Sequence, residues 1–275
     1  MNNLSGCTAI ITGATGGLGP HIARALADQG TNLILAFLPD EEAEPVRPLS
    51  GSTRVVSVPT DIRDSFALEQ LVSSAKREFG TVDILVNNAG VETILPYHRL
   101  RIDDIEQIVR VNLLAAMILT WMVIPGMLER GRGHIVNISS LAAKTGAPCS
   151  EPYIAAKAGV IGFTESLRAE YRGTGVSASV ICPGFIETGI YKRLVNETGF
   201  EAPRAFGRSS PEAVGRAVVD AITKDRPEII VNPGPTRLLT SLAELSPSIG
   251  ASIVRISGIA QWFRKVAAAY ELKRH

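Results

Sequence analysis

The chain has 275 residues, 45% of them hydrophobic, and its 28 basic and 27 acidic side chains leave a net charge near +1. So much apolar material excludes a disordered chain, and the near-neutral charge disfavours a nucleic-acid partner, because phosphate backbones select strongly basic surfaces. The three cysteines, Cys7, Cys149 and Cys182, lack metal-ligand spacing, so we expect no metal site and no disulfide framework. The N-terminus shows no basic and apolar leader, and together with the sparse cysteines this predicts a cytoplasmic protein.

Short runs rich in isoleucine, valine and leucine alternate along the chain with stretches of helical character. Strands are predicted over residues 8–12, 32–37, 54–59, 84–87, 133–139, 177–182 and 228–232. Helices are predicted over residues 20–29, 65–79, 102–130, 153–171 and 211–223. The strands are continuously apolar, as expected when both faces of a sheet are covered. The pattern predicts a doubly wound α/β fold of Rossmann type, with a parallel seven-stranded sheet in three α/β/α layers.

The longest apolar run covers residues 113–128 and is interrupted by Thr120, Pro125 and Gly126. It is shorter than the ~20 residues that a membrane-spanning helix needs, so we predict a buried helix. The sequence has no repeat and no low-complexity linker. We therefore expect residues 1–232 to form a nucleotide-binding catalytic domain and residues 233–275 to be a helical extension of that domain.

The first predicted strand runs directly into a glycine-rich turn, TGATGGLG, over residues 12–19. Gly13, Gly17 and Gly19 allow the backbone to turn tightly and to approach a pyrophosphate closely. The helix that follows presents unpaired N–H groups and the positive end of its dipole to an anion. An ordinary strand-to-helix loop is the alternative, but the position between the first strand and the first helix favours a dinucleotide site.

Tyr153 and Lys157 lie four residues apart at the start of a predicted helix, so their side chains share one face. A free tyrosine has a pKa of about 10, and a nearby ammonium group lowers that pKa and suits the phenol for acid/base catalysis. Taken alone, the pair is better explained as a surface contact, because Tyr-x-x-x-Lys is common by chance. Other polar segments, however, end neighbouring strands at the same edge of the sheet: residues 87–90, Ser139-Ser140 and residues 183–188. Asn112 lies in the long helix between them.

The glycine spacing and the sequence YIAAK resemble the TGxxxGxG and YxxxK motifs of the short-chain dehydrogenase/reductase family, in its main single-domain branch. The resemblance covers roughly residues 5 to 232. It implies an oxidoreductase that transfers a hydride between NAD or NADP and an alcohol or ketone. In this family Tyr153 would exchange the proton with the substrate oxygen, and Lys157 would hold the nicotinamide ribose and lower the pKa of Tyr153. Ser140 would orient the substrate oxygen, with Ser139 as its rival one residue too far away, and Asn112 would hold a water that relays protons from Lys157.

The resemblance also implies a set of cofactor-binding residues. Asp61 and Ile62 would touch the adenine, the segment 88–90 would line the adenosine and ribose, and Ile186 and Thr188 would contact the carboxamide. The full set is Gly13, Thr15, Gly17, Leu18, Gly19, Phe37, Asp61, Ile62, Asn88, Ala89, Gly90, Tyr153, Lys157, Pro183, Gly184, Ile186 and Thr188.

The choice between NAD and NADP is normally made at the end of the second strand, where an acidic residue binds the ribose 2′-OH and a basic one attracts a 2′-phosphate. Phe37 and Leu38 occupy these positions, and neither is charged. Asp40 lies too far along the chain, while Arg63 can reach the same area. The sequence does not distinguish the two cofactors.

The substrate pocket is expected to be mostly apolar, which indicates a hydrophobic alcohol or ketone. Glu92 is the exception: it either binds a polar group of the substrate or is a solvated loop carboxylate. The residues expected to frame the pocket are Val91, Glu92, Thr93, Leu141, Pro148, Phe185 and Tyr191. Residues 185–208 interrupt the strand–helix alternation, and their place after a strand favours a lid over an irregular connection.

The helices predicted over residues 112–130 and 153–171 are apolar on more than one face. In the family this pair forms a four-helix contact between subunits, so we expect a homodimer or homotetramer; a large monomeric core is the alternative. The tail contains an amphipathic helix with Ile259, Trp262, Phe263, Val266, Ala267 and Tyr270 on one face. Packing on this or a neighbouring subunit is favoured over attachment to a membrane surface, which its flanking basic residues would also suit.

Three other functions remain open for such a sequence. A nicotinamide-binding regulator without turnover would keep the fold, but Ser140, Tyr153, Lys157 and Asn112 are all present. A sugar-nucleotide epimerase or dehydratase also uses Tyr-x-x-x-Lys, with a different glycine spacing and a larger C-terminal domain. A peripheral membrane protein acting on lipid-like substrates would use the tail helix as its anchor.

Overall fold

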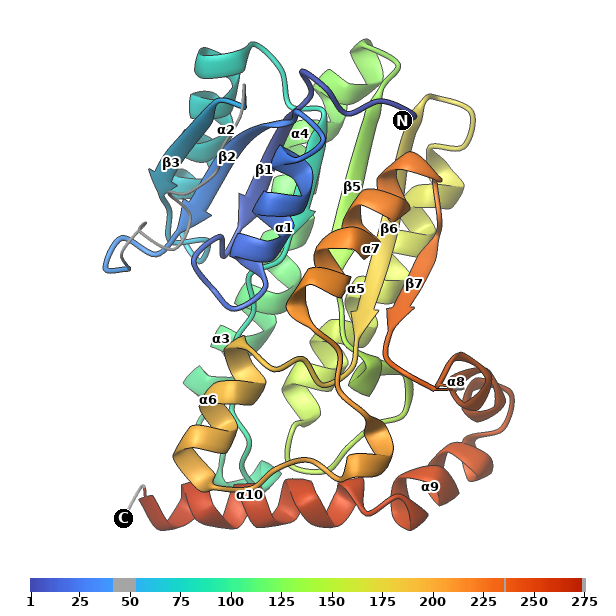
Figure 1. Ribbon diagram of the computed structural model, residues 1–275. Helices are drawn as coiled ribbons and strands as arrows, with labels where there is room; N and C mark the ends of the chain where they lie inside the picture. Colours follow the sequence, from blue (N-terminus) through green and yellow to red (C-terminus); the bar gives the residue numbers. More distant parts are fainter. Residues whose placement is uncertain (42–52, 235, 274–275) are drawn as a thin grey trace.

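Within residues 1–41, 53–234 and 236–273, which the computed structural model describes, seven strands form one parallel sheet (Figure 1). The strands are β1 (Thr8–Thr12), β2 (Asn32–Phe37), β3 (Val55–Pro59), β4 (Ile84–Asn87), β5 (Gly133–Ile138), β6 (Val176–Pro183) and β7 (Glu228–Val231). Their order is β3-β2-β1-β4-β5-β6-β7, and every neighbouring pair is parallel. The predicted doubly wound fold is confirmed, with strand bounds within one residue of those expected from the apolar runs.

Helices cover both faces of the sheet, giving the three expected layers (Figure 1). On one face, α1 (Gly19–Ala27) and α7 (Pro211–Thr223) bury Ile22, Leu26 and Val218 against β1 and its neighbours. The opposite face is covered by α2 (Ser65–Phe79), α4 (Ala115–Glu129) and α5 (Glu151–Glu170). Strands that are apolar throughout are buried on both sides, which explains the continuous runs in the sequence.

The long helix predicted over residues 102–130 consists of α3 (Ile102–Val109), a π-helical turn η3 (Arg110–Leu114) and α4. The predicted bounds are confirmed for the helical segment as a whole, Ile102–Glu129, which by length and composition could cross a membrane. Half of its most apolar window is buried inside the protein, as in the core helix of a globular fold. Asn112 lies within the π turn, a feature that is frequent at functional sites.

The remaining helices gather at the edge where the strands end (Figure 1). They are η2 (Tyr97–Arg99), η4 (Leu141–Lys144), α6 (Gly189–Thr198), η5 (Arg204–Phe206), α8 (Thr236–Leu245), α9 (Pro247–Ile256) and α10 (Ile259–Lys273). The predicted lid therefore contains α6 and η5. The apolar face of α10 packs on this chain, where Trp262 and Phe263 join a buried cluster with Ile94 and Leu194. That face is covered by protein and is not presented to a membrane.

Candidate active site

A cavity of about 790 Å³ lies at the C-terminal ends of the strands, the place where doubly wound sheets bind ligands. Its volume is in the range of small-molecule and cofactor sites. The sequence-predicted residues that line it are Gly13, Gly17, Leu18, Phe37, Asp61, Ile62, Asn88, Ala89, Gly90, Ser140, Tyr153, Lys157, Pro183, Gly184, Ile186 and Thr188. Thr15, Gly19 and Asn112 do not line it. Of the expected substrate-pocket residues, Thr93 and Pro148 lie outside the cavity.

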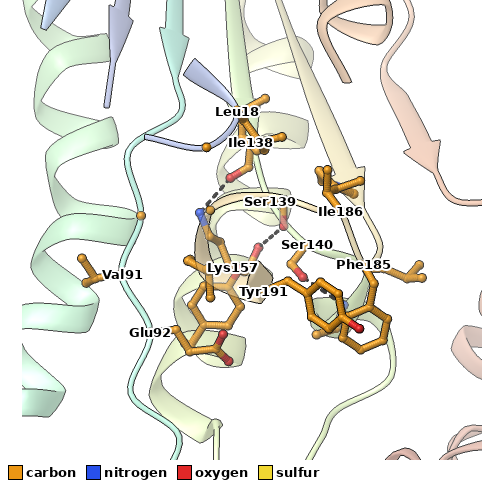
Figure 2. Close-up of a pocket in the computed structure, with 18 of the residues that line it drawn as sticks. Leu18, Val91, Glu92, Ile138, Ser139, Ser140, Lys157, Phe185, Ile186 and Tyr191 are labelled. Carbon is orange, nitrogen blue, oxygen red and sulfur yellow. Dashed lines mark hydrogen bonds between the residues drawn. The ribbon is translucent and has the colours of Figure 1, made fainter. Parts of the chain in front are cut away.

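Lys157, in the first turns of α5, lies against the end of β5 (Figure 2). The Lys157 ammonium is buried, donates to the carbonyl oxygen of Ile138 at 2.8 Å, and lies 5.7 Å from the centroid of the Tyr153 ring. The Ser139 hydroxyl donates to the carbonyl oxygen of Lys157 at 2.8 Å. These two bonds tie the helix to the strand, so both side chains have a fixed position at the cavity wall.

The two neighbouring serines have different partners. Ser139 is buried and its hydroxyl is used to anchor α5. The Ser140 hydroxyl accepts from the amide of Ala142 at 3.2 Å, at the start of η4, and is a hydrogen-bond partner of the Tyr153 phenol. Both serines line the cavity, but the Ser139 hydroxyl is bound to the Lys157 carbonyl, so Ser140 is the one whose hydroxyl interacts with the phenol.

Burial dominates the electrostatics of the pair. It raises the pKa of Tyr153 well above its ordinary value, the carboxylate of Glu92 raises it further, and the hydrogen bond with Ser140 opposes both effects. Burial also lowers the pKa of Lys157 to about 8, with Glu92 acting in the opposite direction. The expectation that Lys157 lowers the pKa of Tyr153 is not met, because desolvation of the phenolate outweighs the favourable neighbours.

Asn112 projects from the π turn into a small cavity beside the main one. Its amide nitrogen donates to the carbonyl oxygens of Val91 and Ile108, at 2.8 and 2.9 Å. Its Oδ1 atom is buried without a hydrogen-bond partner. A Cβ atom on Gly90 would lie 2.9 Å from this oxygen and 3.5 Å from Lys157 Nζ, so both polar atoms approach the same backbone position. An unpaired buried acceptor beside an ammonium group suits a bridging water.

The glycine-rich turn is packed against two other backbone segments. Gly13 has φ of +62°, and a Cβ atom there would lie 2.8 Å from the Cα of Ala89. A Cβ atom on Gly17 would lie 2.2 Å from the amide nitrogen of Gly189, at the start of α6. These close approaches leave no room for a side chain. They produce the bare backbone surface at a helix N-terminus that a pyrophosphate requires.

Side-chain hydrogen bonds join this turn to the end of β4. The Thr12 hydroxyl accepts from the amides of Asn88 and Ala89, both at 3.1 Å. The Asn88 amide group donates to the carbonyl oxygens of Thr12 and Gly13, at 2.9 and 3.0 Å. Residues 88–90 are thus positioned beside the turn, as expected for strand ends that share one edge of the sheet.

At the end of β2 the cavity is lined by the uncharged side chains of Phe37 and Leu38. Two of the charged side chains near them form an ion pair. Arg63 is bound to Asp61, with Nη2 and Oδ2 2.6 Å apart, and it lowers the pKa of that carboxyl. Glu41, which the sequence analysis did not select, also lines the cavity and accepts a hydrogen bond from Thr15. In the sequence, Glu41 could have been selected because it belongs to the acidic residues that follow β2.

The chain matches the family model described as short chain dehydrogenase over residues 7–199. It belongs to the short-chain dehydrogenase/reductase family. The resemblance identified from the glycine turn and the Tyr-x-x-x-Lys motif is confirmed. This short-chain dehydrogenase is thus an oxidoreductase that acts on CH–OH or keto groups with a nicotinamide cofactor.

Relatives extend the similarity beyond the matched segment. A ketoacyl reductase, HetN, of Nostoc sp. is 38% identical over 277 residues, which cover 97% of this chain and 94% of the relative. A D-beta-hydroxybutyrate dehydrogenase of Cupriavidus necator is 34% identical over 70% of this chain and 75% of its own. The crystal structure of levodione reductase superimposes with a TM-score of 0.77 at 23% identity, covers 86% of this chain and 99% of that one, and supports the fold.

The residues present fit the nicotinamide dinucleotide that the family uses. A glycine-rich turn with no room for side chains at Gly13 and Gly17 opens α1, Asn88 is held beside that turn, and the buried Lys157 lines the same cavity. The fit is the same for NAD and NADP, because the β2 end carries apolar side chains at the deciding positions.

Proposed function

We propose that this short-chain dehydrogenase interconverts an apolar secondary alcohol and its ketone, with Tyr153 as the acid/base. The observation that carries the proposal is the arrangement of Tyr153, Lys157 and Ser140 at the wall of one cavity, with the bare glycine turn in the same cavity. A regulator without turnover would not need this buried polar cluster, since burying polar groups is costly.

In this proposal the cofactor pyrophosphate lies on the turn that contains Gly13 and Gly17, and Lys157 holds the nicotinamide ribose. When bound, the nicotinamide accepts hydride from the alcohol carbon or returns it to the ketone carbon. The Thr188 hydroxyl donates to the carbonyl oxygen of Gly17 at 3.2 Å and so joins the segment before α6 to the turn.

The proton moves at the phenolic oxygen of Tyr153. Because burial and Glu92 hold its pKa above the ordinary value, the phenol is protonated at neutral pH and donates to the ketone oxygen during reduction. Ser140 donates a second hydrogen bond to that oxygen and stabilises the charge that develops on it. A water on the free Oδ1 of Asn112 would connect Lys157 with solvent and restore the proton.

The substrate class follows from the lining of the cavity, which is apolar around Val91, Leu141 and Phe185. The relatives whose names state a substrate act on ketoacyl or hydroxybutyrate groups, so a carbonyl with an attached carbon chain is the substrate class that we propose.

Titration of the purified protein with NADH and NADPH, followed by fluorescence, tests this function. We expect micromolar binding of at least one cofactor and oxidation of that cofactor when an apolar ketone is added. Lack of binding by both would contradict the proposal, and the preferred cofactor would decide between NAD and NADP.

We further propose that the protein is a homodimer or homotetramer that pairs through α4 and α5. Trp121 is 75% exposed on α4, with Met117 and Leu114 partly exposed on the same helix. Replacing Trp121 with glutamate should shift the sedimentation coefficient towards the monomer, because a buried unpaired charge opposes association. Phe66→Glu on α2, where the side chain is 65% exposed, is the matched control and should leave the assembly unchanged. A monomeric wild-type protein would contradict the proposal.

A further inference from the structure

Five aromatic side chains, here called the aromatic wall, close one end of the cavity: Phe185, Tyr191, Phe206, Trp262 and Phe263. Phe185 is at the centre of the group, with its ring centroid 5.1 Å from that of Tyr191, 5.4 Å from that of Trp262 and 6.1 Å from that of Phe206. The ring centroids of Trp262 and Phe263 are 4.9 Å apart. Tilted and edge-to-face pairs of this kind form a stable apolar surface.

The aromatic wall belongs to the same cavity as Tyr153. Figure 2 shows the rings of Phe185 and Tyr191 together, across the pocket from Glu92. An apolar group attached to a carbonyl carbon beside Tyr153 would therefore extend towards these rings without crossing solvent.

The tail supplies and anchors two of the five rings. The indole N–H of Trp262 donates to the carbonyl oxygen of Phe200 at 3.2 Å, so its polar atom is satisfied away from the cavity. Tyr270 donates to the carboxylate of Glu197 at 2.5 Å, and Arg99 pairs with Glu271 at 2.9 Å. These contacts hold α10 against α6 and η2. Because the family model ends at residue 199, this part of the wall is a feature that the family match does not define.

Some of the charges near the wall are paired, while Arg193 also lines the cavity and its charge acts on Glu92. Arg208 is positioned over the Tyr191 ring, 5.8 Å from its centroid, and pairs with Glu201 at 2.7 Å and with Glu187 at 3.4 Å. Glu92 accepts a hydrogen bond from Ser150 on the opposite side. The five rings themselves offer no ion-pair partner, so the wall suits an uncharged substituent, because a charged group would lose its hydration against them.

We infer that the aromatic wall binds the alkyl or aryl substituent of the substrate ketone, and that Trp262 supplies a large part of the apolar contact with this substituent. The inference rests on the proposed function and deepens it, since it assigns the substrate's apolar group to the C-terminal helix. It places specificity on residues far along the chain from the residues that handle the proton.

A homologous series of 2-ketones from butanone to 2-decanone measures this directly. In the wild-type protein kcat/KM should rise by about four-fold per added methylene until the wall is covered, as expected for burial of apolar surface. In Trp262→Leu the rise should fall to less than about two-fold per methylene, because part of the apolar contact is lost. Ile256→Ala, an 80% exposed position in the same tail, is the matched control and should keep the wild-type slope.

A second measurement needs no turnover. The sequence has two tryptophans, so Trp121→Phe leaves Trp262 as the single indole. Adding 2-decanone to this variant with its cofactor should shift the indole emission, whereas butanone should not. The inference would be overturned if Trp262→Leu kept the wild-type rise in kcat/KM per methylene, or lost kcat/KM equally on every ketone. It would also be overturned if 2-decanone left the indole emission unchanged. Lack of turnover of any ketone by the wild-type protein would instead reject the proposed function, and the emission shift would still test the wall.

Discussion

Replacing Tyr153 with phenylalanine is expected to lower kcat by about 10²- to 10⁴-fold, the usual contribution of a positioned acid/base group. The substitution removes one hydroxyl from a side chain whose ring lies beside Lys157. The Lys157 ammonium keeps its bond to Ile138, and α5 keeps its anchor at Ser139, so the cavity wall should retain its shape. Cofactor binding should therefore stay close to that of the wild-type protein.

Parallel measurements of kcat and of cofactor binding by fluorescence separate the two effects. Tyr171→Phe, at the far end of the same helix, is a matched control that should leave both quantities unchanged. If Tyr153→Phe reduced the ketone at the wild-type rate, the assignment of Tyr153 as acid/base would be wrong, although membership of the family would stand.

The second large effect is expected for Gly17→Ala. The new methyl group would lie 2.2 Å from the amide nitrogen of Gly189 and 2.7 Å from the Thr188 hydroxyl, so two backbone segments would have to separate. Overpacking of this kind costs about 1–3 kcal/mol, and the separation would also open the turn that is expected to hold the pyrophosphate. We therefore expect at least a ten-fold (~1.4 kcal/mol) weaker cofactor Kd and a lower thermal unfolding midpoint.

Gly16→Ala in the same turn is the control for this prediction. Its Cβ would meet one carbonyl oxygen, that of Gly13, at 3.3 Å, and small adjustments relieve that contact. The Gly16→Ala protein should thus bind the cofactor much more tightly than the Gly17→Ala protein. Equal binding by the two variants would show that the contact between the turn and α6 does not support the cofactor site.

Much of the fold was predictable because its signals are local. Strand runs of isoleucine and valine predicted each strand to within a residue, since buried parallel strands need apolar side chains on both faces. The glycine turn, the Tyr-x-x-x-Lys pair and the polar strand ends were expected at one edge of the sheet. The structure brings them to one cavity, with Asn112 beside it.

Other features were not accessible in this way. The sequence suggested that Lys157 lowers the pKa of Tyr153, whereas burial and Glu92 raise it. Glu92 lies in the loop after β4 and acts on Tyr153 through the tertiary structure. Helical spacing does not reveal this contact. The helix predicted over residues 102–130 is confirmed, but the π turn at Asn112 within it was not predicted.

The sequence by itself determined the sheet, the nucleotide turn and the pair of residues proposed to move the proton, because each of these depends on neighbours within a few positions along the chain. The tertiary structure alone decided where the tail lies and what it does to the cavity. Trp262 reaches Phe185 only because α10 folds back across the strand ends, and that contact joins positions too distant for any periodic pattern to connect. Desolvation and ring packing depend on such long-range contacts, so the proton affinity of Tyr153 and the shape of the substrate pocket follow from the fold as a whole.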